Sequence, residues 1–212
     1  MTQAPARASM SLAVAVAALG AFALLAVVVV DGAAPSWDQT VFRALYNGET
    51  SGPPGAAPND SALLDALLPW IYRTADGRAI ALLAALVLCG LLLARRPRHA
   101  AFVGAACALV LAAGGLKELF ARPAPFISHG GISFPSGHAI GSMAMALSLT
   151  LVVPARLRPL VALGGAAFVV AVAIAVIADG GHWPSDVLAG WLLALAWVSA
   201  LTRPFHISPS ET

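Results

Sequence analysis

The 212-residue chain is 59% hydrophobic and 10% charged with a mean hydropathy of +0.85, which excludes an ordinary soluble protein. The formal net charge of +2 is small and its basic residues are scattered, so we expect no nucleic-acid partner. The composition therefore predicts an all-α integral membrane protein.

Six apolar runs approach the roughly 20 residues that a transmembrane helix needs. They cover residues 10–30, 78–94, 100–120, 138–153, 160–178 and 185–202. The first run follows Arg7, as a cleaved signal sequence would, but it exceeds the usual apolar stretch of about 7–15 residues, so we expect a retained helix. Cys89 and Cys107 fall inside these runs and are expected to be apolar fillers.

Basic residues concentrate on one side of this six-helix arrangement. They are Arg95, Arg96 and Arg98 in one short loop, Arg156 and Arg158 in another, and Arg7 and Arg203 near the ends of the chain. By the positive-inside rule that side is cytoplasmic. The chain is thus expected to be a multi-pass protein of the inner or plasma membrane.

The segment from Asp31 to Asp76 falls on the opposite, extracytoplasmic side. Its centre, residues 51–55, is rich in Gly and Pro, and its flanks, residues 37–46 and 62–72, carry apolar residues at helical spacing. Either short helices on the membrane surface or a flexible loop fits this pattern, and a substrate-gating lid is a hypothesis for the segment. We expect three parts: residues 1–77 with the first helix and this loop, residues 78–203 with the helical core, and the tail 204–212.

Two groups of residues at the end of the third run and the start of the fourth suggest an anion site. Lys117 and Arg122 precede a pair of prolines, and Ser136, Gly137 and His138 open the next helix. Ser is a good N-cap, Gly allows close approach of the backbone, and a helix start attracts anions. The two cations fit a phosphate, although alone they are also typical of snorkelling anchors. His138 has the side chain best suited to protonate a leaving oxygen.

A second histidine, His182, precedes the last apolar run and is followed four residues later by Asp186. One helical turn brings such a pair within hydrogen-bond reach, so that the carboxylate accepts from Nδ1–H and leaves Nε2 unprotonated. The pattern predicts a nucleophilic histidine oriented by a carboxylate. No metal-binding spacing such as His-Glu-x-x-His occurs, and no metal or other cofactor is expected.

In these motifs the chain resembles the type 2 phosphatidic acid phosphatase family, over about residues 78–202. The family pattern is Lys-x6-Arg-Pro, then Pro-Ser-Gly-His, then Ser-Arg-x5-His-x3-Asp, and it is matched at Lys117, Ser136, Gly137, His138, His182 and Asp186. The resemblance implies a haloperoxidase-like helical core. It also implies His182 as nucleophile, Asp186 as its partner and His138 as general acid, with Lys117, Ser136 and the Gly137 amide binding phosphoryl oxygens.

Both phosphate-binding arginines of the family are missing from their places, which are occupied by Ala124 and Val176. Arg122 stands two positions early and is expected to compensate if the loop turns it inward; His129 is the second candidate. The negative charge of Asp179 would repel a phosphate unless Asp179 pairs with a cation; alternatively, Asp179 orients a polar head group. Each uncompensated loss of a charge-stabilising donor typically costs about 10²–10³ in rate.

The resemblance implies a membrane-embedded phosphatase that hydrolyses a lipid phosphate, or a polyprenyl phosphate or diphosphate, through a phosphohistidine intermediate on the extracytoplasmic side. Two alternatives stay open. A phosphotransferase uses the same residues with an alcohol or sugar in place of water. A non-catalytic member binds lipid head groups: the missing arginines favour it, and the intact histidines and Asp186 oppose it. The expected partners are a lipid phosphate and the bilayer.

Overall fold

In a computed structural model, residues 4–29, 34–46, 62–125 and 131–207 are described, and they form α-helices joined by short loops and one 3-10 turn, with no β-strand among them. The helices are α1 (Ala4–Val29), α2 (Ser36–Leu45), α3 (Ala62–Thr74), α4 (Gly77–Leu93), α5 (Pro97–Phe120), α6 (Gly137–Val152), α7 (Arg158–Ala178) and α8 (Pro184–Leu201). The all-α prediction is confirmed, and each predicted transmembrane run coincides with one of these helices.

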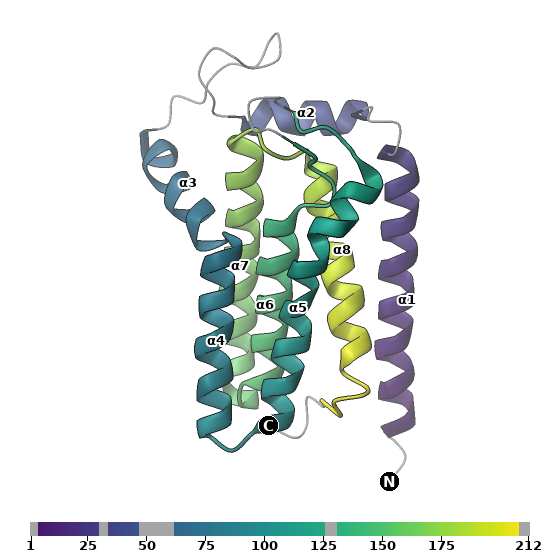
Figure 1. Ribbon diagram of the computed structural model, residues 1–212, viewed down its shortest axis with the longest axis vertical. Coiled ribbons are helices and arrows are strands. Elements are labelled where there is room, and N and C mark those ends of the chain that lie inside the picture. The colour runs from purple at the N-terminus through teal and green to yellow at the C-terminus, as the bar shows by residue number, and fades with distance from the viewer. Residues whose placement is uncertain (1–3, 30–33, 47–61, 126–130, 208–212) are drawn as a thin grey trace.

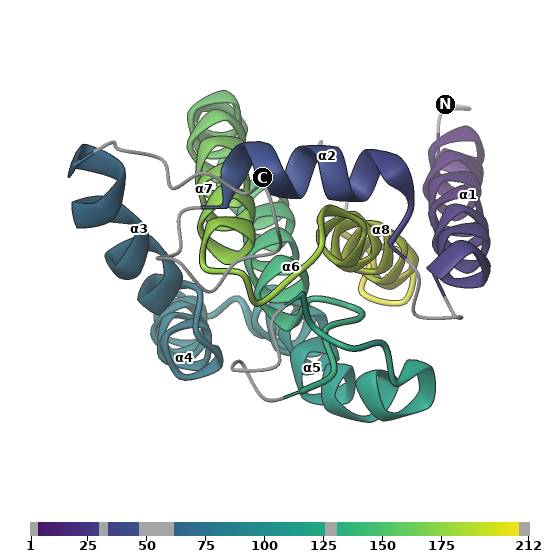
Figure 2. The same cartoon turned by 90° about the horizontal axis from the view of Figure 1, so that it is seen from above.

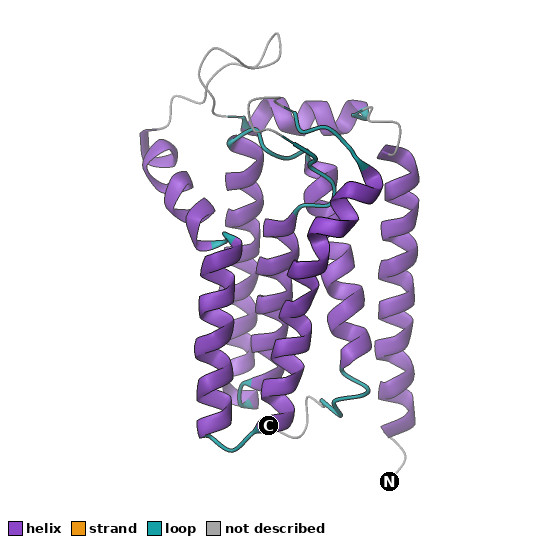
Figure 3. Ribbon diagram, in the orientation of Figure 1, coloured by secondary structure: helices purple, strands orange, loops and turns teal. Residues whose placement is uncertain are grey.

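The helices α1, α4, α5, α6, α7 and α8 stand side by side as an upright bundle, and α2 lies across one end of it (Figure 1). From that end, α2 crosses over α7 and α8, with α1 beside α8 and with α3 and α4 on the far side of α7 (Figure 2). Loops gather at the two ends of the bundle (Figure 3). The end covered by α2 carries the loops before α6 and α8, so both histidine motifs lie there.

Large apolar side chains point outward along the bundle, as expected for contact with lipid. Leu24, Leu111 and Leu163 are 72%, 86% and 72% exposed. A soluble protein rarely exposes continuous apolar faces of this kind. The chain is a multi-pass membrane protein.

The predicted number of six spans is not confirmed. Among the described residues, four helices are long and apolar enough to cross a bilayer, or five if Ala66–Thr74 and Gly77–Leu93, which meet at a bend of 55°, form one span. The remaining apolar helix, α6, has 16 residues, or about 24 Å of helix against the roughly 30 Å of hydrocarbon. It is short because the loop before it descends into the bundle, so that α6 begins deeper than the neighbouring end of α7 (Figure 1).

The two flanks of the segment 31–76 are helical, which supports short helices there over a flexible loop. α2 buries Phe42, whose ring lies 5.3 Å from that of Tyr46 and 5.0 Å from that of Trp183. The contact with Trp183, the residue before α8, attaches α2 to the bundle end. The Gly/Pro-rich centre lies outside the described residues, and the lid stays a hypothesis.

The interior of the bundle is built around α6. Along α6 the buried side chains include Ala139, Ile140, Ala144 and Met145, and Cys107 of α5 packs beside them as an apolar filler without a disulfide. At the top of the bundle, Gly190 of α8 lies so close to α6 that a Cβ atom there would stand 2.8 Å from both the Ala139 Cβ and the Ser136 carbonyl oxygen. The absence of a side chain at Gly190 therefore lets the two histidine-bearing helix starts approach each other.

Candidate active site

The start of α6 is held by Ser136 and by a contact with α8. The Ser136 hydroxyl caps α6 by accepting a hydrogen bond from the Ala139 amide at 3.4 Å, and the Ser136 amide donates to the Asp186 carbonyl at 3.0 Å. Ser136 is fully buried, whereas Gly137 and His138 are half-buried. Ser136 thus fixes the turn, and the next two residues are the ones a ligand can reach.

The start of α8 brings His182 and Asp186 together. The Trp183 amide donates to Asp186 Oδ2 at 2.8 Å, which caps the helix. His182 Nδ1 stands 3.7 Å from the same oxygen, which is longer than a hydrogen bond, and this buried nitrogen has no hydrogen-bond partner within the described part of the chain. The positive φ of Gly180, 81°, turns the chain from α7 toward His182.

The two histidines face one another across the bundle end. The ring centroids of His138 and His182 lie 6.1 Å apart with the rings 71° from parallel, and the Tyr72 ring lies 4.5 Å from that of His138. His138 Nε2 is also buried without a hydrogen-bond partner among the described residues. Buried polar atoms are normally bonded, so the unbonded His138 Nε2 is an atom that a bound ligand would satisfy, whereas the unbonded His182 Nδ1 faces Asp186.

Lys117, in the last turn of α5, is the cation expected beside these groups. It is half-buried, and it interacts electrostatically with both Asp186 and His138. The sequence-predicted residues Lys117, His138, His182 and Asp186 are therefore placed together.

Arg122 points inward, but its terminal nitrogens are already bonded. The chain leaves α5 through Ala121 in a left-handed conformation, φ 48°, and Arg122 turns into the protein with 1% of its surface exposed. Its Nη1 donates to Asp186 Oδ1 and to Ser185 Oγ, both at 2.6 Å, and its Nη2 donates to Asp38 Oδ2 at 2.9 Å. Arg122 supports Asp186 instead of standing free for a phosphate. His129, the second candidate, lies outside the described residues.

Asp38 of α2 is a site residue that the sequence analysis missed. It is fully buried, its Oδ1 accepts from the Ser185 amide at 2.8 Å, and its Oδ2 accepts from the Ser185 hydroxyl as well as from Arg122. We call Asp38, Arg122, Ser185 and Asp186 the buried network. Breaking a buried ion pair by removing one partner typically costs about 3–5 kcal/mol, so each member holds the others. One signal was available, because Asp38 lies one turn before the apolar Phe42, on the buried face of an amphipathic helix.

The place of the family's second arginine is filled by the apolar core. Val176 is fully buried and packs in one cluster with Phe42, Tyr46 and Val172. Ala175 is also buried. The helix α2 therefore covers with Phe42 the position at which the family pattern has a cation.

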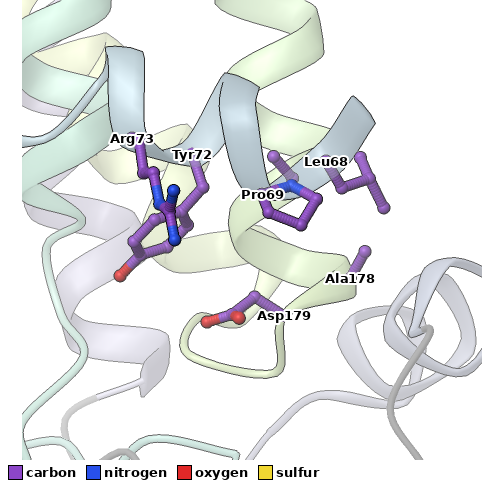
Figure 4. A pocket seen from close by; sticks show the side chains of 7 residues that line it. Leu68, Pro69, Tyr72, Arg73, Ala178 and Asp179 are labelled. Atoms are coloured by element: carbon purple, nitrogen blue, oxygen red, sulfur yellow. The ribbon is translucent and has the colours of Figure 1, made fainter. Parts of the chain in front are cut away.

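A cavity of about 310 Å³ opens between α3 and the end of α7. Its lining combines apolar side chains with three polar ones, and Figure 4 shows Tyr72, Arg73 and Asp179 around it; the complete lining is Leu68, Pro69, Tyr72, Arg73, Ala175, Ala178 and Asp179. Tyr72 joins the cavity to the site, because the same ring contacts that of His138. Burial, with the nearby Asp179 carboxylate, raises the pKa of Tyr46 above its ordinary value, so this phenol is neutral.

No metal site accompanies the histidines in the described ranges, where no group of three or more His, Cys, Asp or Glu side chains is arranged to hold an ion. The groups present are two imidazoles, one carboxylate and one ammonium. This set can attack a phosphorus atom, transfer a proton and stabilise negative charge.

Comparisons with known proteins bear on the family and on the fold. Residues 98–207 match the PAP2 superfamily. The fold is similar to the crystal structure of a transmembrane PAP2 type phosphatidylglycerolphosphate phosphatase from Bacillus subtilis, with a TM-score of 0.69, 20% sequence identity, and coverage of 91% of this chain and 95% of that chain. A search of curated proteins gave no match.

Proposed function

Because the chain belongs to the PAP2 superfamily, we propose that it is a membrane phosphatase that hydrolyses a lipid phosphate through a phosphohistidine intermediate at His182. The observation that carries this proposal is the convergence of His182, Asp186 and His138 at one bundle end, with His182 Nδ1 3.7 Å from Asp186 Oδ2 and His138 Nε2 buried without a hydrogen-bond partner among the described residues. The family and the fold support a lipid phosphatase; the mechanism is inferred from the residues.

In the first step His182 Nε2 attacks the phosphorus atom, and the bond between phosphorus and the lipid oxygen breaks. His138 gives its proton to that oxygen, and the lipid alcohol leaves. Asp186 accepts the hydrogen bond from His182 Nδ1–H and stabilises the positive charge that forms on the ring. The 3.7 Å contact shortens as that charge develops, since catalytic hydrogen bonds are often long before the substrate binds.

In the second step water attacks the phosphohistidine, His138 takes one of its protons, and inorganic phosphate leaves His182 free. Lys117 and the amides at the start of α6 stabilise the negative oxygens in both steps. With Arg122 engaged in the buried network, Lys117 is the cation assigned to this role.

The cavity supports a lipid as the substrate. Leu68, Pro69, Ala175 and Ala178 give it an apolar wall, Tyr72 and Arg73 give it polar groups, and the Tyr72 ring contacts that of His138. A site that is partly apolar with a few polar groups suits a head group attached to an acyl or prenyl chain. The basic loops lie at the other end of the bundle, which by the positive-inside rule supports an extracytoplasmic position for this cavity.

The experiment that tests the proposal is phosphate release by the purified protein in detergent. The panel contains phosphatidic acid, phosphatidylglycerophosphate, and polyprenyl mono- and diphosphates. His182→Ala is the test variant, and His206→Ala, an exposed histidine after α8, is the matched control. We expect release from one lipid class in the native protein and the control but not in His182→Ala; undiminished release in His182→Ala would contradict the mechanism.

One observation favours a non-catalytic lipid-binding protein as a second candidate: both family arginines are replaced and Arg122 is occupied. This candidate predicts that a lipid phosphate binds without turnover. Calorimetric binding of a lipid phosphate with no release from any member of the panel would favour it. A phosphotransferase would give a phosphorylated acceptor when an alcohol or sugar is added, which product analysis detects.

A further inference from the structure

The buried network connects the interfacial helix α2 to the reacting histidine. From the network we propose that Asp38 is a positioning residue for phosphoryl transfer, acting on His182 through Arg122 and Asp186. The inference rests on the proposed function, because it specifies how the nucleophile of that site is oriented and how its positive charge is stabilised. Asp38 itself does not line the cavity.

Asp38 fixes the orientation of the Arg122 guanidinium. Asp38 Oδ2 holds Arg122 Nη2 at 2.9 Å, and Ser185 Oγ, which donates to the same carboxylate, accepts from Arg122 Nη1. The planar guanidinium is thereby fixed from two sides, and Nη1 meets Asp186 Oδ1 at 2.6 Å. The other oxygen of Asp186 is left for the Trp183 amide and for His182. Without Asp38, Arg122 would no longer be held at Asp186 Oδ1, and Asp186 Oδ2 would no longer be reserved for the Trp183 amide and His182.

Asp38 also sets the net charge beside His182. Two carboxylates, Asp38 and Asp186, share the single guanidinium of Arg122, so the buried network carries one net negative charge. Without the Asp38 charge, Arg122 would neutralise Asp186. A histidine that attacks phosphorus through Nε2 while Nδ1 keeps its proton becomes positively charged, and a net negative neighbour stabilises that state.

Other charged and titratable groups surround His182 and set the background for this effect. They come from every element packed at the bundle end: Asp186 on α8, Arg122 after α5, Lys117 on α5, His138 on α6, Asp38 and Tyr46 from α2, Tyr72 and Asp76 from α3 and the turn after it, and Asp179 after α7. Of these, Asp38 and Arg122 are fully buried together, where screening by water is weakest. At an effective dielectric constant of about 20, a unit charge roughly 10 Å away moves a titration by about one pH unit.

The test is the substitution Asp38→Asn, which keeps the shape and removes the charge. We expect kcat to fall by about 10–100-fold, by analogy with the loss on removing a residue that orients a metal-ligating histidine, with KM little changed. The acid limb of the pH profile of kcat/KM is expected to move to lower pH by about one unit, because the protonated imidazole of His182 loses a stabilising charge. A residue that only supports the fold would lower activity without moving this limb.

Two further variants make the test specific. Glu118→Gln makes the same chemical change at an exposed residue of α5 and is expected to leave the profile unchanged. Asp38→Asn combined with Arg122→Gln removes both charges and returns the network to one net negative charge. The acid limb is therefore expected to return to its native position, and this double variant replaces Asp38→Asn if the latter does not fold.

A measurement without turnover separates this inference from the proposed function. The titration midpoint of the His182 imidazole is followed by nitrogen NMR in detergent, with His182→Ala to assign the signal. We expect the midpoint to fall by about one pH unit in Asp38→Asn and to return in the double variant. An unchanged midpoint in Asp38→Asn, or a further fall in the double variant, overturns the inference even if the lipid panel shows phosphate release. A shifted midpoint with no release from any lipid supports the role of Asp38 and instead refutes the proposed hydrolysis.

Discussion

The close approach of α8 to the start of α6 gives the sharpest prediction, and Gly190→Ala is the perturbation. The added Cβ would stand 2.8 Å from the Ala139 Cβ and the Ser136 oxygen and 3.2 Å from the Ile140 nitrogen. Two of these atoms belong to the backbone, so no flexible side chain can move aside. Reaching an ordinary contact of 3.4 Å requires the helices to separate by about 0.6 Å.

Such a separation acts on both stability and turnover. Overpacking of a well-packed site typically costs about 1–3 kcal/mol. Because α8 carries Asp186 and follows His182 while α6 carries His138, the two histidines move apart, and a misplacement of about 1 Å can cost 10²-fold in rate. We therefore expect a lower midpoint of thermal unfolding and a kcat reduced by about one to two orders of magnitude.

The assay compares thermal unfolding and phosphate release in detergent with those of Gly164→Ala. Gly164 is an exposed helical glycine of α7, and no atom lies within 4 Å of the place that an added Cβ would take. The same substitution there is expected to stabilise the protein by about 0.5–1 kcal/mol. Native stability and native kcat in Gly190→Ala would refute the importance of this contact.

Three further predictions concern the cavity and the charges. Ala178→Phe is expected to fill the cavity between α3 and α7 and to raise KM for a long-chain lipid phosphate while leaving hydrolysis of a short soluble phosphate ester unchanged; an equal effect on both substrates would show that the lipid chain lies elsewhere. Lys117→Met is expected to lower kcat by about 10²–10³-fold with Lys117→Arg retaining most of it, and a fully active Lys117→Met would remove Lys117 from the site. Val176→Arg, which restores the family residue, is expected to lower the free energy of unfolding by several kcal/mol, because the charge enters the apolar cluster of Phe42 and Val172. The control Ala124→Arg, at a half-buried loop position, is expected to fold normally. A stable Val176→Arg protein would show that α2 can make room for the missing cation.

The bundle helices and the central motif residues could be predicted because their signals are local. Apolar runs mark the bundle helices, and the spacing of four residues brings His182, in the loop before α8, close to Asp186 in the first turn of that helix. Proline and serine at the start of α6 and α8 likewise mark helix starts. The number of spans was harder, since the depth at which α6 begins depends on how its preceding loop packs.

The role of Arg122 could not be predicted from its surroundings in the sequence. Its partners Asp38 and Asp186 are 84 and 64 residues away along the chain, and its direction depends on the left-handed turn at Ala121. The apolar residue at position 176 is explained by the cluster that Val176 shares with Phe42 of α2, which is also remote in the sequence. In both cases the missing information was the position of α2 across the bundle end.

The most direct measurement is the site of phosphorylation after rapid quenching of the purified protein with a radiolabelled lipid phosphate that it hydrolyses. A label that is stable in base, labile in acid and located by mass spectrometry on His182 is predicted. It should be absent in His182→Ala and present in His206→Ala. A label on another residue, or hydrolysis at the native rate in His182→Ala, would contradict a phosphohistidine at His182.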